Sequence, residues 1–196
     1  VFAMSQSGET FDTLSALKFS QSKGAKTAAV VNVMGSSIAR MVDKVILQGS
    51  GPEICVISTK AALSQMVVLT LLAMKLGLKK KVISKKTYQE NLKSLKELPA
   101  IIQGVLNERS GFIHRIANKY CKNKNWLYLG RGIYYPIALE AALKMKEVAY
   151  VHAEGMPGGF LKHGTLAMID DDISSIVFVP PKEKKDLYQS TMHSIE

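Results

Sequence analysis

Short apolar runs alternate with longer amphipathic stretches along most of the chain. The short runs are rich in β-branched and apolar residues, which predicts buried strands at Val1–Met4, Thr27–Val33, Lys44–Leu47, Trp126–Leu129 and Ser174–Val179. Helical patterns fill the stretches between them. This alternation predicts a three-layer α/β/α fold in which parallel sheets lie between helices.

The expected helices are bounded by hydroxyl caps at their starts and by glycines at their ends. They cover Thr10–Ser22 with Gly24 as its stop, a short helix from Ser36 to Val42, a long one from Ser58 or Thr59 to Lys75 with Gly77 as its stop, Tyr88–Leu106, Ile113–Tyr120, Ile133–Ala149, and a last helix from Glu183.

Two α/β units joined by a helical connector account for this order. The first unit covers residues 1–83, the connector 84–120 and the second unit 121–196. Val1 already lies inside a strand, and Ser194–Glu196 ends within a helical pattern. We therefore expect both units to be truncated and the chain to be a piece of a larger polypeptide.

The charge of the chain limits its partners. The formal net charge is +10, and much of the excess lies in lysine runs such as Lys79–Lys81 and Lys182–Lys185, which are expected to be solvated faces. A nucleic-acid site would need aromatic residues among the basic ones, and aromatic residues make up only 7% of the chain. The sequence therefore predicts no nucleic-acid partner, whereas a positive field that attracts small anions stays open.

Cysteine use and hydropathy point to a cytoplasmic protein. Cys55 and Cys121 form no CxxC pair and no metal-binding cluster, so both are expected to be reduced, mostly buried thiols. Ser64, Gln65, Thr70 and Lys75 interrupt Leu63–Leu76, and no apolar run is expected to be long enough to span a bilayer. We expect no metal, no cofactor and no membrane partner.

The segment Ser5–Thr10, SQSGET, carries the first candidate chemistry. It follows a strand and precedes a helix, so amides at the helix start and nearby hydroxyls can hold a phosphate without a metal. Ordinary helix capping by Ser and Thr explains the same pattern. The same two alternatives apply to Ser58–Thr59.

Lys144 and Glu147 share one face of the predicted helix Ile133–Ala149, and Glu140 extends that face. A glutamate held beside a lysine can act as a base toward a carbon acid. The alternative is a surface ion pair of small energetic value.

The glycine-rich segment His152–Gly164 is predicted to be a loop that carries function. His163 can move a proton to or from a sugar ring oxygen near neutral pH, or it can simply bond to the backbone. Gly130–Gly132 is a weak glycine turn that lacks the dinucleotide-binding pattern.

Taken together, these motifs closely resemble the sugar isomerase (SIS) half of the glucosamine-6-phosphate synthase family. The resemblance runs through nearly the whole chain. It rests on SQSGET (5–10), STKA (58–61), LGRG (129–132), ALEAALKMKEVAYVHAEGMPGG (138–159) and LKHG (161–164).

The resemblance implies two SIS subdomains, each a five-stranded parallel sheet between helices, that convert fructose-6-phosphate and glutamine-derived ammonia to glucosamine-6-phosphate. It implies Glu147 as the base between C1 and C2, Lys144 as the group that steadies the enolamine, and His163 as the ring opener that reaches a neighbouring subunit in a homodimer. It assigns phosphate binding to Ser5, Gln6, Ser7 and Thr10, and the sugar pocket to Val56 and Ser58, with Glu53 nearby.

Departures from the family pattern are also visible. The N-terminal glutaminase domain, the early SIS strands and the C-terminal Schiff-base lysine are absent from this chain, and Phe160 stands where the family usually has Glu. Two alternatives stay open: a stand-alone sugar-phosphate isomerase or deglycase, and a non-catalytic phosphosugar sensor. A sensor would need the phosphate turn but neither Glu147 nor Lys144, so their presence favours an enzyme.

Overall fold

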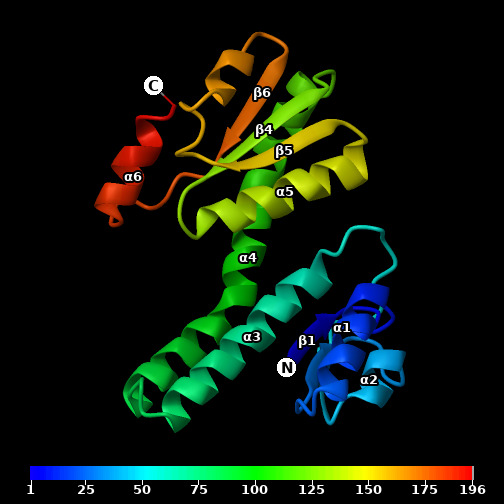
Figure 1. Ribbon diagram of the computed structural model, residues 1–196. Helices are drawn as coiled ribbons and strands as arrows, with labels where there is room; N and C mark the ends of the chain where they lie inside the picture. Colours follow the sequence, from blue (N-terminus) through cyan, green and yellow to red (C-terminus); the bar gives the residue numbers. More distant parts are fainter. Residues whose placement is uncertain (196) are drawn as a thin grey trace. The chain divides into compact units, whose positions relative to one another are not determined.

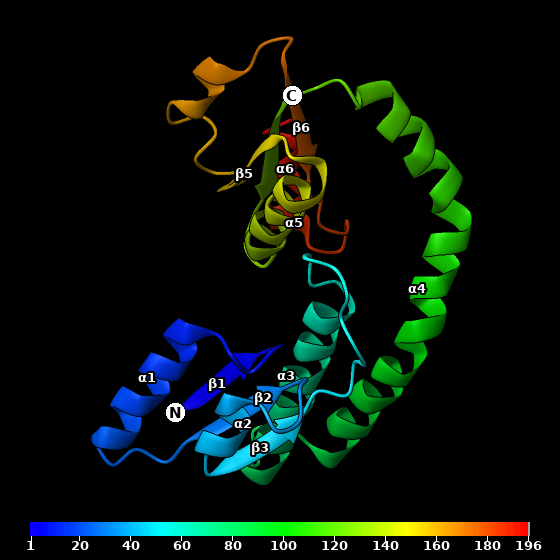
Figure 2. The same cartoon turned by 90° about the vertical axis from the view of Figure 1, so that its right-hand side faces the viewer.

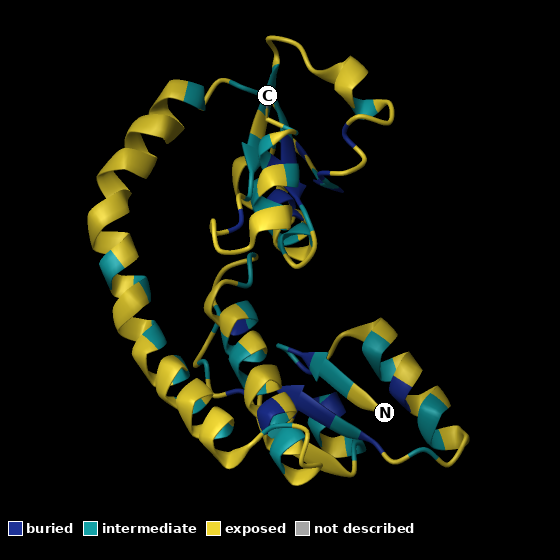
Figure 3. Ribbon diagram, turned by 90° about the vertical axis from the view of Figure 1, so that its left-hand side faces the viewer, coloured by how far each residue is buried: buried dark blue, intermediate teal, exposed yellow. Residues whose placement is uncertain are grey.

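The computed structural model describes residues 1–195, and these fall into two compact units that divide between Leu106 and Asn107 (Figure 1). The dividing point lies within a single helix, α4, that covers Lys85–Tyr120. The sequence pattern predicted two helices there, Tyr88–Leu106 and Ile113–Tyr120. The structure corrects this, because the helix continues through the residues between them, and most of it is exposed (Figure 3).

The first unit contains a parallel sheet of three strands in the order β1-β2-β3 (Figure 2). Its elements are β1 (Phe2–Ser5), α1 (Phe11–Ser22), β2 (Ala28–Val31), α2 (Ser37–Met41), β3 (Lys44–Leu47) and α3 (Lys60–Lys79), followed by the first part of α4. Ser5 pairs with Val31, and Val31 pairs with Leu47, so the carboxyl ends of all three strands meet at one edge. Leu17, Ala29, Val31 and Ile38 form the buried core.

The stop of α1 at Gly24 is confirmed. Gly24 adopts a φ of 75°, and its amide donates to the Gln21 carbonyl at 2.9 Å while the Ala25 amide donates to Ser20 at 3.1 Å. This pair of bonds is a Schellman motif, which satisfies the last carbonyls of a helix.

The predicted stop of α3 at Gly77 is wrong. The helix runs to Lys79, and a Cβ at Gly77 would lie 3.4 Å from Cγ1 of Ile83. The Gly77 carbonyl also accepts bonds from the amides of Val82 and Ile83. The glycine therefore gives space to the turn into α4, and the first part of α4 runs beside α3 in the opposite direction (Figures 1 and 2).

Helix α3 also corrects the expectation about apolar runs. Lys60–Lys79 is long and apolar enough to cross a membrane by length and composition, with a mean hydropathy of 1.7 and 11% of its apolar window buried. Core helices of soluble proteins and signal sequences pass the same test, so the finding does not assign a membrane.

The second unit contains another parallel sheet of three strands, in the order β5-β4-β6. Its elements after α4 are β4 (Asn125–Gly130), α5 (Tyr134–Ala149), β5 (His152–Pro157), a 3₁₀ turn η1 (Thr165–Met168), β6 (Ile173–Val177) and α6 (Lys185–Met192). Side chains alternate along β4. Tyr128 packs with Ala138 and Ala142 of α5, whereas Leu127 and Leu129 pack with Leu161 on the other face.

Residues 152–157 were expected to be loop, and the structure shows that they are β5. Gly155 pairs with Tyr128 in the sheet, and a Cβ there would lie 2.6 Å from Cα of Leu139. The glycine thus lets the backbone of α5 lie directly against the strand, a role that glycine also has inside strands. Each sheet has three strands within residues 1–195, where the family resemblance implied five.

Both cysteines are exposed free thiols, which corrects the expectation that they are mostly buried. Cys55 lies in the loop between β3 and α3, and Cys121 directly follows α4. The expected solvent exposure of the lysine runs Lys79–Lys81 and Lys182–Lys185 is confirmed.

Candidate functional site

The turn after β1 places its hydroxyls at the carboxyl edge of the first sheet. Ser5 Oγ accepts the Gly8 amide at 2.9 Å and lies 2.9 Å from Thr10 Oγ1, while Ser7 Oγ accepts the Glu9 amide at 3.2 Å. Ser5 is 5% exposed, so its hydroxyl organises the turn from inside. Thr10 makes no side-chain cap bond to α1, so it leaves the first amides of that helix uncapped. Gln6 and Ser7 are partly exposed in the same turn.

The first residues of α2 hold this turn through their backbone amides. The Ile38 amide donates to the Gly8 carbonyl at 2.9 Å, and the Ser37 amide donates to Glu9 Oε1 at 2.7 Å. Hydrogen bonds from the side chain and the backbone of Ser37 lower the pKa of Glu9. Glu9 therefore stays ionised at the start of α2, and the turn is held by two elements of its own unit.

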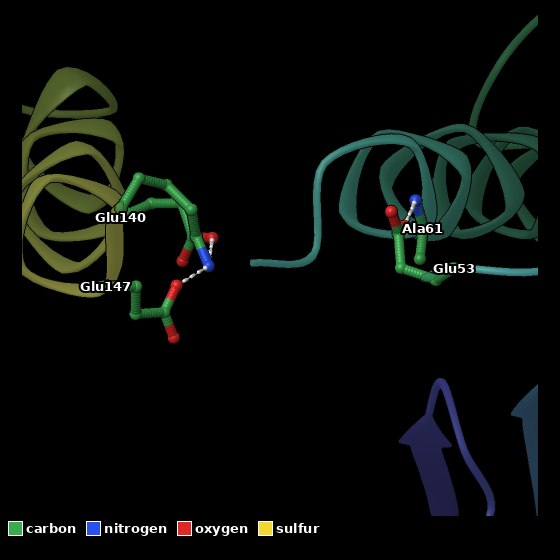
Figure 4. Close-up of polar contacts among 5 residues, drawn as sticks. Glu53, Ala61, Glu140 and Glu147 are labelled. Atoms are coloured by element: carbon green, nitrogen blue, oxygen red, sulfur yellow. Dashed lines mark hydrogen bonds and ion pairs between the residues drawn. The ribbon is translucent and has the colours of Figure 1, made fainter. Parts of the chain in front are cut away.

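The predicted sugar-pocket residues lie in the loop between β3 and α3. Glu53 Oε2 accepts the Ala61 amide at 2.9 Å, so this carboxylate caps α3 (Figure 4). We expected Ser58 or Thr59 to supply the cap, but Thr59 makes no side-chain cap bond. Val56 is 84% exposed and Ser58 is partly exposed.

In the second unit, Lys144 lies between two carboxylates on α5. Its Nζ is 2.6 Å from Glu147 Oε2 and 3.4 Å from Glu140 Oε1 (Figure 4). Desolvation opposes the charge of Lys144, but the hydrogen bond with Glu147 and the charge of Glu140 outweigh it and raise its pKa. The side chains of Lys144 and Glu147 are 23% and 25% exposed, so this pair combines partial burial with access.

His163 lies in the turn after β5, at the carboxyl end of that strand, whereas Lys144 and Glu147 lie near the end of α5 that leads into β5. Its amide donates to the Phe160 carbonyl at 2.9 Å, and the two rings meet edge-on with centroids 6.4 Å apart. His163 borders a pocket of about 450 Å³. It is lined by Gly130, Arg131, Gly132, Pro157, Gly159, Phe160, His163, Leu187 and Ser190.

Helix α5 separates Glu147 from this pocket. The pocket touches Gly130–Gly132, which precede the helix, and Glu147 is thirteen residues beyond the first residue of α5, Tyr134. At 1.5 Å per residue, that distance is about 20 Å along the axis. Met145 and Ala149, near the far end, instead line a groove of about 850 Å³ together with residues that precede β4 and β6.

Some of the predicted site residues therefore lie together in the structure, and others lie apart. Ser5, Ser7 and Thr10 share one turn, and Lys144 contacts Glu147, but His163 lies at the other end of the second sheet. Sequence reasoning missed Arg131, which bonds to the loop that carries His163. A long cationic residue between two glycines at the end of a strand was the available signal. Among residues 1–195, no group of three or more His, Cys, Asp or Glu side chains is arranged to hold a metal ion.

A family model described as the SIS domain matches residues 1–75 and 119–192. Glutamine–fructose-6-phosphate aminotransferase (isomerizing) of Methanococcus maripaludis is 44% identical over 196 residues, which is 100% of this chain and 32% of that protein. The enzyme of the same name from Thermus thermophilus is 39% identical over 194 residues, which is 99% of this chain and 32% of that protein. The chain therefore spans about a third of the length of these relatives.

The fold comparison points the same way. The C-terminal domain of glucosamine-fructose-6-phosphate aminotransferase from Francisella tularensis matches with a TM-score of 0.92 and 35% identity. The match covers 99% of this chain and 55% of that one.

Proposed function

This chain belongs to the SIS domain family, and from that premise we propose that it is the sugar isomerase part of an amidotransferase. The complete protein would make glucosamine-6-phosphate from fructose-6-phosphate and glutamine-derived ammonia. The observation that carries the proposal is that the two relatives described above bear the same enzyme name and match nearly the whole chain at 39% to 44% identity. The chain spans about a third of them, and the glutaminase domain would precede it.

The turn after β1 would bind the phosphate. Ser5 and Thr10 fix its shape through their shared hydrogen bond, which leaves Gln6, Ser7 and the uncapped amides of α1 to face the anion. Helix N-termini favour anions through their free amides and their dipole. Val56 and Ser58, with Glu53 nearby, would line the sugar pocket; the Glu53 carboxylate holds the start of α3 and thereby shapes their loop.

Glu147 would move the proton. Its carboxylate takes a proton from C1 of the aminated ketose while the imine nitrogen gains one, which gives an enolamine. It then returns its proton at C2 while the C1 hydroxyl loses one, which leaves the aldehyde of the amino aldose. Lys144 keeps its charge because its pKa is raised, so its ammonium would stabilise the negative charge that develops on the substrate.

His163 would open the sugar ring by protonating the ring oxygen as the bond from C2 to that oxygen breaks and the C2 hydroxyl loses its proton. A hexose phosphate is shorter than the roughly 20 Å that α5 places between the His163 pocket and Glu147. We therefore propose that the two groups of one chain act on different sugars, in a homodimer in which His163 serves the partner's substrate. Free, exposed thiols are consistent with the cytoplasmic location that the proposal includes.

The function is tested in the complete protein by measuring glucosamine-6-phosphate formation from fructose-6-phosphate with glutamine or ammonia. Glu147→Gln should reduce turnover by at least about a hundredfold, the usual contribution of a positioned general base, and leave substrate affinity within twofold. Glu108→Gln, on the exposed face of α4, is the matched control. Unchanged turnover in Glu147→Gln rejects the base, and isomerisation without amination would favour the stand-alone isomerase.

The dimer is tested by mixing two inactive variants, Glu147→Gln and His163→Ala. A mixed dimer keeps one site in which both groups are intact. With equal amounts and random exchange, half of the dimers are mixed, so activity should return to about a quarter of the unmodified level, following the isologous pairing of a two-fold dimer. No recovery after verified exchange would show that both groups act within one chain.

A further inference from the structure

We propose that Arg131 is a positioning residue that fixes the loop carrying His163. Its Nη2 donates to the Gly158 carbonyl at 3.0 Å and to Ser194 Oγ at 2.7 Å. Ser194 Oγ in turn lies 3.4 Å from the same Gly158 carbonyl. One guanidinium therefore joins the turn after β4, the first loop residue after β5 and the segment that follows α6. The catalytic meaning of this arrangement rests on the proposed function.

The side chain of Arg131 lies along the loop backbone. A Cβ at Gly158 would be 3.2 Å from Cγ of Arg131 and 3.4 Å from its Nε, and a Cβ at Gly159 would be 3.4 Å from Nη1. Two successive glycines thus allow a close approach that larger residues would hinder. The Gly158 amide also donates to the Gly130 carbonyl at 2.8 Å, so the loop leaves β5 from a fixed point.

A second anchor lies on the far side of Phe160. Leu161 is 4% exposed and packs in the core with Leu127, Leu129 and Met156. His163 follows two residues later, and its backbone amide closes the turn by donating a hydrogen bond to the Phe160 carbonyl. The position of the imidazole therefore depends on Arg131 at one end of a short glycine-rich segment and on Leu161 at the other.

Without the arginine, the residues between the Gly158 amide and Leu161 keep mainly local backbone bonds, such as the one from the Phe160 amide to the Pro157 carbonyl. Glycine has the largest conformational freedom of any residue, and both Phe160 and His163 are exposed. Arg131 Nε is buried with no hydrogen-bond partner among the described residues, which is an unfavourable state for a polar group. The two hydrogen bonds that Arg131 Nη2 donates offset the cost of burying Nε without a partner.

The first test is hydrogen exchange of the amides of residues 158–163 in the complete protein. Arg131→Met keeps the aliphatic contact with Gly158 and removes the guanidinium. Exchange of these amides should become about ten- to a hundredfold faster, the factor expected for losing a bond to a charged donor. Arg131→Lys should recover part of the protection, because a lysine reaches one acceptor but lacks the planar fork. Ser194→Ala, a milder change, should show a smaller acceleration.

Arg115→Met is the matched control, because Arg115 lies on the exposed surface of α4 beside Phe112. Unchanged loop exchange in Arg131→Met and Ser194→Ala would overturn the proposal. A uniform loss of protection across the second unit would also overturn it, because it would show general destabilisation instead of a held loop.

The second test is steady-state kinetics. Arg131→Met should lower kcat by about ten- to a hundredfold with KM for fructose-6-phosphate within twofold, since the phosphate turn is untouched. A loosened loop with unchanged kcat would refute the positioning role. If the unmodified protein forms no glucosamine-6-phosphate at all, the proposed function fails, and the exchange comparison still decides whether Arg131 holds the loop.

Discussion

Gly8→Ala should destabilise the first unit more than an ordinary glycine substitution. Gly8 adopts a φ of 69°, and a Cβ there would lie 2.0 Å from Ser36 Oγ and 2.5 Å from Ser36 Cβ. A rotamer change can move the Oγ but not the Cβ, so α2 itself must shift. The left-handed backbone costs roughly 1 to 2 kcal/mol, and the overlap adds roughly 1 to 3 kcal/mol. The total loss is therefore about 2 to 5 kcal/mol.

Gly24→Ala isolates the backbone part of that cost. Gly24 has a φ of 75°, and a Cβ there would meet no atom within 4 Å, so only about 1 to 2 kcal/mol is expected. Adding Ser36→Gly to Gly8→Ala removes both clashing atoms and should return the double variant to the level of Gly24→Ala. This comparison separates the contact from the backbone conformation.

Hydrogen exchange at the β2 amides measures the loss within the first unit. Every 1.4 kcal/mol corresponds to a tenfold faster exchange, so Gly8→Ala should accelerate it by about thirty- to several-thousandfold. Unfolding followed through Trp126, which lies in the second unit, should keep its midpoint. If Gly8→Ala exchanges no faster than Gly24→Ala, the packing argument for the turn is refuted.

Three further outcomes follow from the same contacts. Ser7→Ala should weaken fructose-6-phosphate binding about fivefold by calorimetry, and equal affinity would argue against the phosphate turn. Gly155→Ala should cost about 1 to 3 kcal/mol in the second unit, seen as an earlier Trp126 unfolding midpoint; an unchanged midpoint would contradict the close approach of α5. Bonds from the backbone and the side chain of Thr27 lower the pKa of Asp43 from 3.8. They therefore stabilise the first unit above pH 3.8 and are lost as the pH falls through the lowered pKa. Asp43→Asn should flatten this acid dependence of β2 exchange, and an unchanged pH profile would count against it.

Glycines show where the sequence could and could not predict the fold. Gly24 was correctly predicted to end a helix, and its φ of 75° supplies the reason. Gly77 and Gly155 were interpreted as a stop and a loop, but they lie inside a helix and a strand because Ile83 and Leu139 approach them closely. A missing Cβ permits both a positive φ and a close contact, and only the tertiary neighbour decides between them.

The candidate site shows the same limit. Helical spacing places Lys144 and Glu147 on one face, as predicted, and the structure shows that the two side chains make contact. Glu53 as the cap of α3 could not be found in this way, because its partner Ala61 is eight residues away across an irregular loop. Arg131 contacts Gly158 and Ser194, which are farther still along the chain. Local patterns predict local contacts, whereas the Glu53 bond depends on the path of an irregular loop and the Arg131 bonds depend on which strands and helices lie side by side.

The two proposed proton-transfer groups are therefore held by different means. Glu147 lies on α5, and the hydrogen bonds of that helix fix its backbone. The neighbouring Lys144 lies 2.6 Å from its carboxylate. His163 lies on a glycine-rich turn, and groups on loops are positioned less sharply than groups on helices. Its geometry depends on Arg131, which bonds to Gly158 before the turn, and on Leu161, which anchors the turn in the core. Substitutions around Glu147 should then mainly change the chemistry of its carboxylate, whereas substitutions around His163 should mainly change the position of its imidazole. Loss of Arg131 therefore separates an effect on position from an effect on chemistry.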